Sequence, residues 1–300
     1  MKVAVAGSSG LIGTGLLAAL RSEGHDVVRL VRRPAEGRNE VRWDPVRGEL
    51  DPAELEGVEA FVNLAGAGIG DKRWTPERRK ELLDSRVVPT RLLAETAARL
   101  DPRPAAFLGG SAVGWYGYDT GDAEKTEADP HGHGFLSDVV VAWEQATHAA
   151  EEAGIRTVLL RSGVVLSTAG GALAKQLLPF KLGLGGRLGS GRQHLPWISL
   201  ADEVGAIMFC LAQEALSGPV NLTAPEPVTN AEFTKTLGGL LHRPTLVPTP
   251  TRALTALFGE DMVREMLLGG TRAIPAKLQE HGFRWLHPTL DVALRDILGR

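Results

Sequence analysis

The 300-residue chain contains one cysteine and two tyrosines, and its 36 acidic residues nearly balance its 33 basic ones. A single cysteine excludes a disulfide scaffold and a cysteine-rich zinc site. Cys210 lies in the helical pattern VGAIMFCLAQ, which is typical of a small buried thiol rather than a nucleophile. The net charge of -3 gives no reason to expect binding to nucleic acid or to an anionic membrane.

Long hydrophobic runs are also missing. No apolar segment approaches the ~18 residues of a membrane span, and the first residues lead into a glycine-rich loop rather than a cleavable signal region. We therefore expect a soluble, cytoplasmic protein with no membrane attachment. We expect no metal site, because His131 and His133 lie in a glycine-rich segment without an obvious third ligand.

Short β-rich runs such as KVAVA, DVVRLV and RTVLLRS alternate with helical patterns along the first half of the chain. This order predicts an α/β fold, a Rossmann-type doubly wound parallel sheet with helices on both faces. Glycine-rich and proline-dotted segments follow, and they predict a smaller, mostly helical substrate lobe. We place the nucleotide-binding domain at residues 1–162 and 195–222, and the lobe at residues 163–194 and 223–300.

The segment GSSGLIG contains a GxxGxxG pattern that follows a predicted strand and opens a predicted helix. Glycines suit such a turn because the backbone approaches the phosphates closely and the helix N-terminus holds the pyrophosphate. The context therefore predicts dinucleotide binding. The residues expected to contact the cofactor here are Gly7, Ser8, Ser9, Gly10, Leu11, Ile12 and Gly13.

The end of the second predicted strand indicates which dinucleotide is bound. An acidic residue at this point would hydrogen-bond the ribose 2′-hydroxyl of NAD, but Arg32 and Arg33 stand there instead. Guanidinium groups form charge-assisted hydrogen bonds to a 2′-phosphate. We therefore predict NADP(H) as the cofactor; an ordinary solvated arginine pair is the alternative.

Further cofactor contacts are expected at the carboxyl ends of later strands, where open α/β sheets bind their ligands. Ala65 and Gly66 end the FVNLAG strand, and their lack of bulk would admit a ribose or nicotinamide. Ser162 and Gly163 end the RTVLLRSG strand and could contact the nicotinamide amide. Trp43, at the end of a third strand, could flank the adenine or pack in the core.

Longer motifs carry a family resemblance. GSSGLIG, NLAG, SAVGWYG, LLRSGVVL and GSGRQHLPWISLAD resemble, in order and spacing, the extended short-chain dehydrogenase/reductase superfamily. DKRWTPERRKELLDSRVVPT and the ending GFRWLHPTLDVALRDIL resemble an atypical subgroup labelled epimerase family protein, which ends in a domain of unknown function. The label records ancestry, because a fold does not establish a reaction.

The resemblance also implies a catalytic pair that this chain lacks. In the superfamily, a Tyr-x-x-x-Lys pair exchanges a proton with the substrate while the nicotinamide takes or gives hydride. No Tyr-x-x-x-Lys occurs in this sequence. Counted from Glu144, which resembles a superfamily glutamate, Leu136 and Val140 take the two places.

Other residues are therefore candidates for the proton transfer. Ser111 fits the position of the superfamily's strand-end serine, although aligning backward from Tyr116 puts Ala112 there instead. We predict Ser111 and Tyr116 as the catalytic residues, with packing or substrate positioning as the alternative for Tyr116. Glu127 and Asp138 are carboxylates near the expected cleft and could act as bases.

Three polar residues are predicted to contact the substrate. Arg86 falls where the superfamily often has asparagine, and Arg192 and Gln193 lie in the segment that lines the superfamily's cleft. Asp202, in the same segment, is expected to cap the helix that follows. The dipeptide Leu195-Pro196 replaces a superfamily Arg-Asp pair. This replacement argues against a nucleotide-sugar substrate.

The combined features predict an NADP(H)-dependent atypical short-chain dehydrogenase/reductase, a reductase or epimerase that acts on a small hydroxyl or carbonyl compound. The alternative is a catalytically degenerate NADP(H)-binding protein with a regulatory or redox-sensing role, which the loss of the pair favours. Superfamily members often dimerise through helices on one face of the sheet, so a homodimer is also expected from the resemblance.

Overall fold

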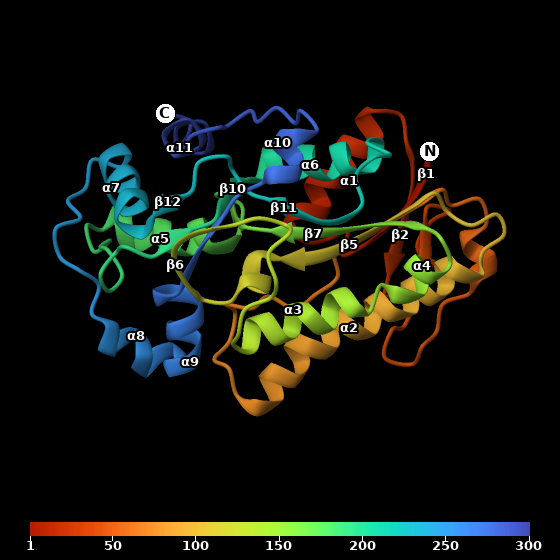
Figure 1. The fold of residues 1–300 in the computed structure, drawn as a ribbon, viewed down its shortest axis with the longest axis horizontal. Coiled ribbons are helices and arrows are strands. Elements are labelled where there is room, and N and C mark those ends of the chain that lie inside the picture. Colours follow the sequence, from red (N-terminus) through yellow and green to blue (C-terminus); the bar gives the residue numbers. More distant parts are fainter.

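A seven-stranded parallel sheet forms the centre of the computed structural model, which describes residues 1–300. Its strand order is β11-β7-β5-β4-β1-β2-β3, so the chain starts in the middle of the sheet and winds outward in both directions (Figure 1). The predicted fold class is confirmed. The strands are β1 (Lys2–Ala6), β2 (Asp26–Val31), β3 (Glu40–Arg42), β4 (Ala60–Asn63), β5 (Ala106–Ala112), β7 (Arg156–Ser162) and β11 (Gly218–Leu222).

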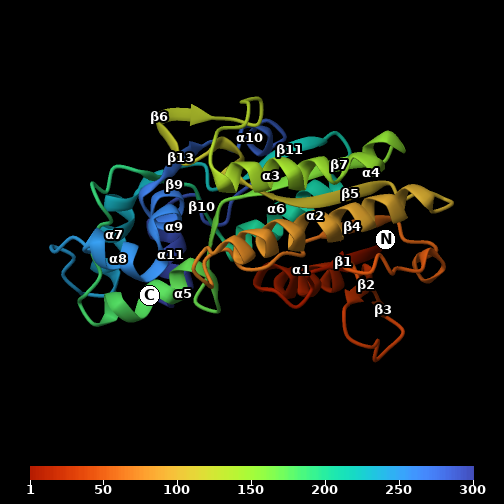
Figure 2. The ribbon, with the colours of Figure 1, turned by 90° about the horizontal axis from the view of Figure 1, so that it is seen from below.

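Helices cover both faces of this sheet (Figure 2). One face carries α1 (Leu11–Ser22), α6 (Leu200–Ala212) and α10 (Ala276–Glu280), and the other carries α2 (Pro76–Arg99), α3 (Phe135–Gln145) and α4 (His148–Glu152). Thr75 caps α2 by accepting a hydrogen bond from the backbone N–H of Arg78, and Pro76 occupies the first turn, as such residues do at helix starts. None of the helices combines the length and the apolar character that a bilayer crossing requires.

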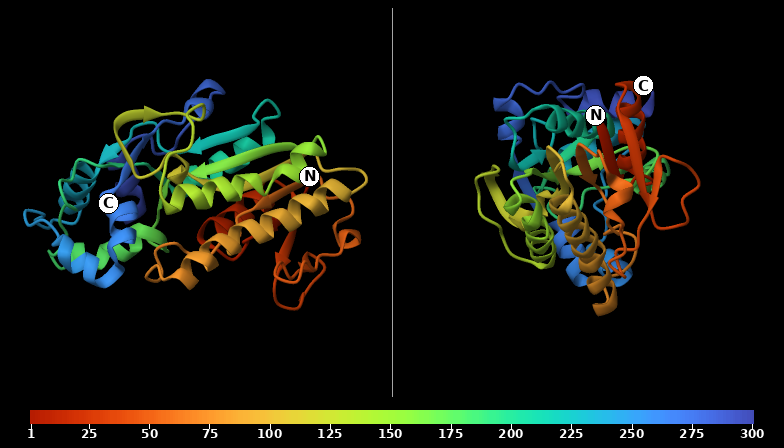
Figure 3. Two further views of the ribbon diagram at one scale, coloured as in Figure 1. Left: turned by 60° about the horizontal axis from the view of Figure 1, so that its bottom comes forward. Right: turned by 90° about the vertical axis from the view of Figure 1, so that its right-hand side faces the viewer.

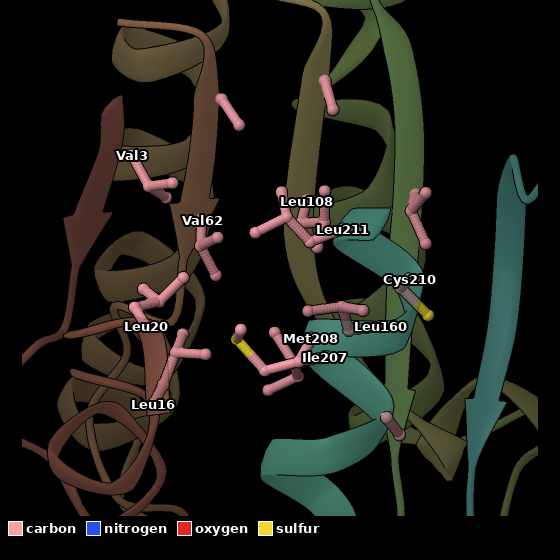
Figure 4. Packing of buried hydrophobic residues seen from close by; sticks show 14 of the residues in the cluster. Val3, Leu16, Leu20, Val62, Leu108, Leu160, Ile207, Met208, Cys210 and Leu211 are labelled. Atoms are coloured by element: carbon pink, nitrogen blue, oxygen red, sulfur yellow. The ribbon is translucent and has the colours of Figure 1, made fainter. Parts of the chain in front are cut away.

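The main core lies between the sheet and the α1–α6 layer. Its strands are buried on both faces, which explains why they are nearly continuous apolar runs. Figure 4 shows side chains of α1 and α6 packed against strand residues, among them Leu16, Leu20, Ile207, Met208, Val62 and Leu160. Cys210 is fully buried in this core, and burial raises the pKa of its thiol to about 12. The predicted burial of this cysteine is confirmed.

The smaller lobe lies beyond the carboxyl ends of the sheet strands, whose arrows point toward it (Figure 3). Trp197 and Phe233 lie at the centre of its core. Its helices are α5 (Gly171–Lys181), α7 (Asn230–Leu240), α8 (Thr251–Phe258), α9 (Glu260–Met262), a π-helix (Val263–Leu268) and α11 (Leu290–Leu298). Three two-stranded ladders lie outside the central sheet: β6 (Asp119–Lys125) pairs with β13 (Gly270–Ala273), β8 (Val164–Leu166) with β10 (Trp197–Ser199), and β9 (His194–Leu195) with β12 (Val228–Thr229).

Near its end the chain returns to the first domain. Leu278 of α10 is part of the main core. Asp202 does not cap α6, because Ser199 accepts the N–H of Asp202 and takes that role. The carboxylate of Asp202 instead accepts the backbone N–H groups of Leu286 and His287, at 2.7 and 3.0 Å. Asp202 is therefore not the helix cap that we expected. It connects α6 to the C-terminal segment by hydrogen bonds.

A residue of the smaller lobe also caps α3, the helix on which Leu136 and Val140 take the places of the superfamily's Tyr and Lys. Gly134 precedes α3 and offers no side chain, so the first N–H groups of the helix need another acceptor. Glu265, from the π-helix, accepts hydrogen bonds from the backbone N–H groups of Phe135 and Leu136, at 3.2 and 3.0 Å. A carboxylate at this end also interacts favourably with the helix dipole.

Replacing Glu265 with alanine is therefore expected to lower the free energy of unfolding by about 1–2 kcal/mol, the usual effect of losing a helix N-cap. Glu265→Gln keeps one acceptor oxygen and should lose less. Urea denaturation followed by circular dichroism measures both. The matched control is Glu152→Ala, because Glu152 is exposed in α4 and should change stability by less than about 0.5 kcal/mol. Equal losses in Glu265→Ala and in the control would contradict the capping role.

Candidate cofactor site and the cleft beside it

The glycine-rich turn between β1 and α1 cannot carry side chains at two of its positions. Gly7 has φ +75°, and a Cβ there would lie 2.5 Å from the carbonyl oxygen of Leu64. A Cβ on Gly13 would lie 2.2 Å from the carbonyl oxygen of Gly7. Gly10 begins the helix without a side-chain cap. The N–H groups of the first turn of α1 are therefore free for an anionic ligand.

A cavity of about 1200 Å³ opens beside this turn, and its walls include the ends of β2, β3 and β4 and the first turns of α2. Eight predicted cofactor residues line it: Gly7, Ser8, Ser9, Gly10, Arg32, Arg33, Ala65 and Gly66. The remaining ones lie outside this lining. Leu11 approaches Gly170 of the lobe, Ile12 packs on the core and Gly13 supports the turn, while Ser162 and Gly163 lie at the carboxyl end of β7.

Three arginines, Arg29, Arg32 and Arg33, line the part of the cavity next to β2. They differ in whether an acidic side chain neutralises their charge. Arg33 donates two hydrogen bonds to Glu40, at 2.8 and 2.7 Å, and Arg29 donates one at 3.0 Å. The hydrogen bonds from Arg33 are the main reason that the pKa of Glu40 falls to about 2. Arg32 lines the cavity, is exposed and has neither an ion pair nor a side-chain hydrogen bond. Its charge is therefore available to a ligand.

Arg29 also donates a hydrogen bond from Nε to the hydroxyl of Ser8, at 3.3 Å. It joins β2 to the glycine-rich turn, a role that our sequence analysis missed. The available signal was an arginine in the middle of an otherwise apolar strand, where a charge is costly unless it is paired.

The residues after β4 are held by α2. Ser85 accepts a hydrogen bond from the N–H of Ala67, at 3.1 Å, and Arg86 donates to the carbonyl oxygen of Ala67, at 2.9 Å. Arg86 is 7% exposed and forms no ion pair, and burial is the main reason that its pKa falls to about 10. Its side chain packs under Gly66, where a Cβ would lie 3.3 Å from it. Arg86 thus lies beneath the cavity wall that Gly66 forms.

Ser111 and Tyr116 lie in one buried hydrogen-bond network. The Ser111 hydroxyl donates to Glu144, at 2.6 Å, and Arg161 donates to both oxygens of the same carboxylate, at 2.8 and 3.0 Å. The Tyr116 hydroxyl donates to Asn221, at 2.7 Å, and accepts from Arg161, at 3.2 Å. Burial is the main reason that the pKa of Tyr116 rises to about 12. Both hydroxyls therefore already have partners inside the protein.

The places of the missing pair are apolar and packed. Leu136 and Val140 lie against Gly114, where a Cβ would meet a carbon of each side chain at 3.6 Å. Leu136 also contacts a small hydrophobic cluster that contains Trp74 and Met262. The side chains at these two places thus pack α3 against the turn that follows β5.

A family model described as "NAD dependent epimerase/dehydratase family" matches residues 3–222. The chain belongs to this family. A second model, described as "Domain of unknown function (DUF1731)", matches residues 249–297. The order of the two matches agrees with the resemblance drawn from the motifs.

Relatives of the same kind match over nearly the whole chain. The chain is 50% identical to the epimerase family protein Mb2239 of Mycobacterium bovis over 292 residues, covering 97% of this chain and 96% of that protein. It is 38% identical to the human epimerase family protein SDR39U1 over 301 residues, covering 99% and 100%. A crystal structure of human SDR39U1 (isoform 2) with NADPH superposes with a TM-score of 0.90 at 36% identity, covering 100% of both chains.

The remaining polar candidates of this family member are distributed over both lobes. Glu127 is 7% exposed, and its Oε1 accepts the backbone N–H groups of Asn221 and Lys277, at 3.0 and 3.3 Å. Gln193 donates to the carbonyl oxygens of Leu188 and Leu267, at 3.1 and 3.0 Å, and thereby holds the π-helix. The side chains of Asp138 and Arg192 are exposed. The catalytic and substrate-binding roles stay predictions.

Proposed function

We propose that this protein binds NADP(H) and uses it in a redox reaction, as a reductase or epimerase of the atypical short-chain dehydrogenase/reductase type. The observation that carries the proposal is the unpaired Arg32 at the rim of the cavity. The crystal structure of the human relative with NADPH supports the same cofactor. The residues present fit this group, because the turn lacks side chains at Gly7 and Gly13 and leaves the N–H groups of α1 free.

When bound, NADP(H) supplies or accepts the hydride. The residues of this chain shape the space in which the cofactor would bind. Ala65 and Gly66 leave room at the end of β4, and Arg86 and Ser85 hold that segment in place. The substrate class that we propose is a small hydroxyl or carbonyl compound. The uncharged side chains of Leu195 and Pro196 cannot form ion pairs with a nucleotide diphosphate.

Arg32→Ala tests the cofactor assignment. We expect the dissociation constant for NADPH to rise by about 10- to 100-fold, because hydrogen bonds to a charged group contribute about 1.5–3 kcal/mol. Affinity for NADH should not change. Fluorescence titration with both nucleotides measures the difference. Arg47→Ala is the control, because Arg47 is 70% exposed and lies outside the cavity lining. Equal affinity of the unaltered protein for NADH and NADPH would overturn the assignment.

A second candidate is an NADP(H)-binding protein without turnover, with a regulatory or redox-sensing role. The partners of the Ser111 and Tyr116 hydroxyls inside the protein favour it. Incubating the protein with NADPH and panels of carbonyl compounds and nucleotide sugars separates the two functions. Turnover supports the enzyme. Tight NADPH binding with no turnover on any panel supports the binding protein.

A further inference from the structure

A buried carboxyl group lies beside the end of β7, in a place that no motif singled out. Glu203, in the first turn of α6, is 0% exposed. Its Oε1 lies 2.5 Å from the hydroxyl oxygen of Ser162, the last residue of β7. Its other oxygen, Oε2, is buried and has no hydrogen-bond partner. Ser162 itself is only partly buried and lies at the edge of the sheet where ligands bind.

The surroundings of Glu203 disfavour its charged form. It has no ion pair, and the desolvation that accompanies burial raises its pKa to about 8. The titratable group that interacts with it is the Cys210 thiol further along α6, whose own pKa is raised, so it stays neutral. The neighbouring Asp202 turns away to the backbone of Leu286 and His287. Glu203 is therefore largely a neutral carboxylic acid at pH 7.

A neutral carboxyl group is a proton donor, which an ionised one is not. If Glu203 donates its proton to the oxygen of Ser162, the serine hydrogen needs another acceptor. The carbonyl oxygen of Leu160 lies 3.5 Å away, at the limit of a hydrogen bond. The Ser162 hydroxyl is therefore free to donate to a ligand at the strand end. Ser111 differs, because its hydroxyl is committed to a charged carboxylate that Arg161 neutralises.

We propose that Ser162 and Glu203 form the proton donor of the redox reaction, in place of the absent Tyr-x-x-x-Lys pair. Ser162 is the catalytic residue that touches the substrate oxygen, and Glu203 is a positioning residue that holds the proton behind it. This inference rests on the proposed redox function.

The step balances for the reduction of a carbonyl group. NADPH, when bound, would supply the hydride of the new C–H bond and be oxidised to NADP⁺. The Ser162 hydroxyl gives its proton to the carbonyl oxygen, which becomes the alcohol. The Glu203 carboxyl returns a proton to the Ser162 oxygen and remains as a carboxylate, until a proton from solvent restores the acid. In the oxidative direction the same protons move back.

The first test asks whether Glu203 holds a proton, and it needs no substrate. Infrared difference spectra of the whole protein at pH 7, unaltered minus Glu203→Gln, should contain the carbonyl band of a protonated carboxylic acid. The band should titrate away around pH 8. A carboxylate band at pH 7 would overturn the pair, whatever the enzyme's activity.

The pH dependence of stability, compared between the unaltered protein and Glu203→Gln, provides a second test. The direction of the expected change follows from the raised pKa of Glu203. The folded pKa of Glu203 is above the unfolded value of about 4.3, so the unaltered protein loses stability as the pH rises from about 4 to 8. The glutamine side chain of the variant does not ionise. The melting temperature of Glu203→Gln relative to the unaltered protein should therefore rise across this range and level off above it. A constant difference would contradict a buried neutral acid.

The third test measures catalysis with a substrate from the panels. Ser162→Ala should lower kcat by about 100-fold or more, within the range of general acid catalysis. Ser162→Thr keeps the hydroxyl and should restore most of the rate. Glu203→Gln should lower kcat with little change in KM, and the fall of kcat above pH 8 should disappear.

The outcomes separate the two proposals. If the unaltered protein does not bind NADPH, the cofactor assignment is overturned. NADPH binding without any turnover overturns the redox function and the proton donor with it. Turnover that Ser162→Ala retains within twofold overturns the Ser162–Glu203 pair alone and leaves the redox function standing.

Discussion

Replacing Arg161 with methionine is expected to lower the free energy of unfolding by about 3–5 kcal/mol, because it leaves the buried Glu144 carboxylate without its counter-charge. Arg161 is 2% exposed and donates to both oxygens of Glu144. It also donates to the hydroxyl of Tyr116 and stacks on Trp115, with its guanidinium carbon 4.0 Å from the ring centre. One side chain thus joins β7 to α3 and to the turn that follows β5.

Urea denaturation followed by tryptophan fluorescence measures this loss. Arg295→Met is the matched control, because Arg295 forms a surface ion pair with Asp291 and surface pairs contribute about 0–1 kcal/mol. Adding Glu144→Gln to Arg161→Met should recover part of the stability, since it removes the unpaired charge. A loss of less than about 1 kcal/mol in Arg161→Met would show that the network does not stabilise the fold in this way.

Replacing Gly13 with alanine is expected to weaken NADPH binding by on the order of 100-fold, equivalent to about 2.7 kcal/mol. The new Cβ would lie 2.2 Å from the carbonyl oxygen of Gly7 and 2.9 Å from the Cα of Ser8. Both are backbone atoms, so the turn itself has to move. The N–H groups that face the phosphates would move with it.

Fluorescence titration with NADPH measures the affinity, and circular dichroism verifies that the variant is folded. Gly239→Ala is the control, because Gly239 lies in helix α7 and a Cβ there meets nothing within 4 Å. That substitution should leave NADPH binding unchanged and should stabilise the helix slightly. NADPH affinity within threefold of the unaltered value in Gly13→Ala would show that the cofactor does not bind against this turn.

The parts of the fold that follow from local pattern were predictable from the sequence. Apolar runs of strand length alternating with helical periods gave the parallel sheet. The surroundings of Cys210 indicated its burial. The glycine-rich turn was predictable because its spacing follows from backbone geometry alone.

The direction of single side chains was not predictable in the same way. Neighbouring residues of a strand point to opposite faces, so an ambiguity of one residue between Ser111 and Ala112 decides where a hydroxyl lies. The structure turns Ser111 toward Glu144. The partner of Tyr116 is Asn221, 105 residues further along the chain, and no local pattern connects them. Glu203 was missed because its partner and its burial come from tertiary packing.

The return of the C-terminal segment to the first domain has a consequence for how the protein is made. Leu278 is part of the main core, the ring of Phe283 packs against Phe209 of α6 at a tilt of 60° with ring centres 5.4 Å apart, and Trp285 donates to the carbonyl oxygen of Thr223. During synthesis these residues follow the last strand of the sheet, β11. The nucleotide-binding domain therefore completes its core only after the segment that contains them has left the ribosome.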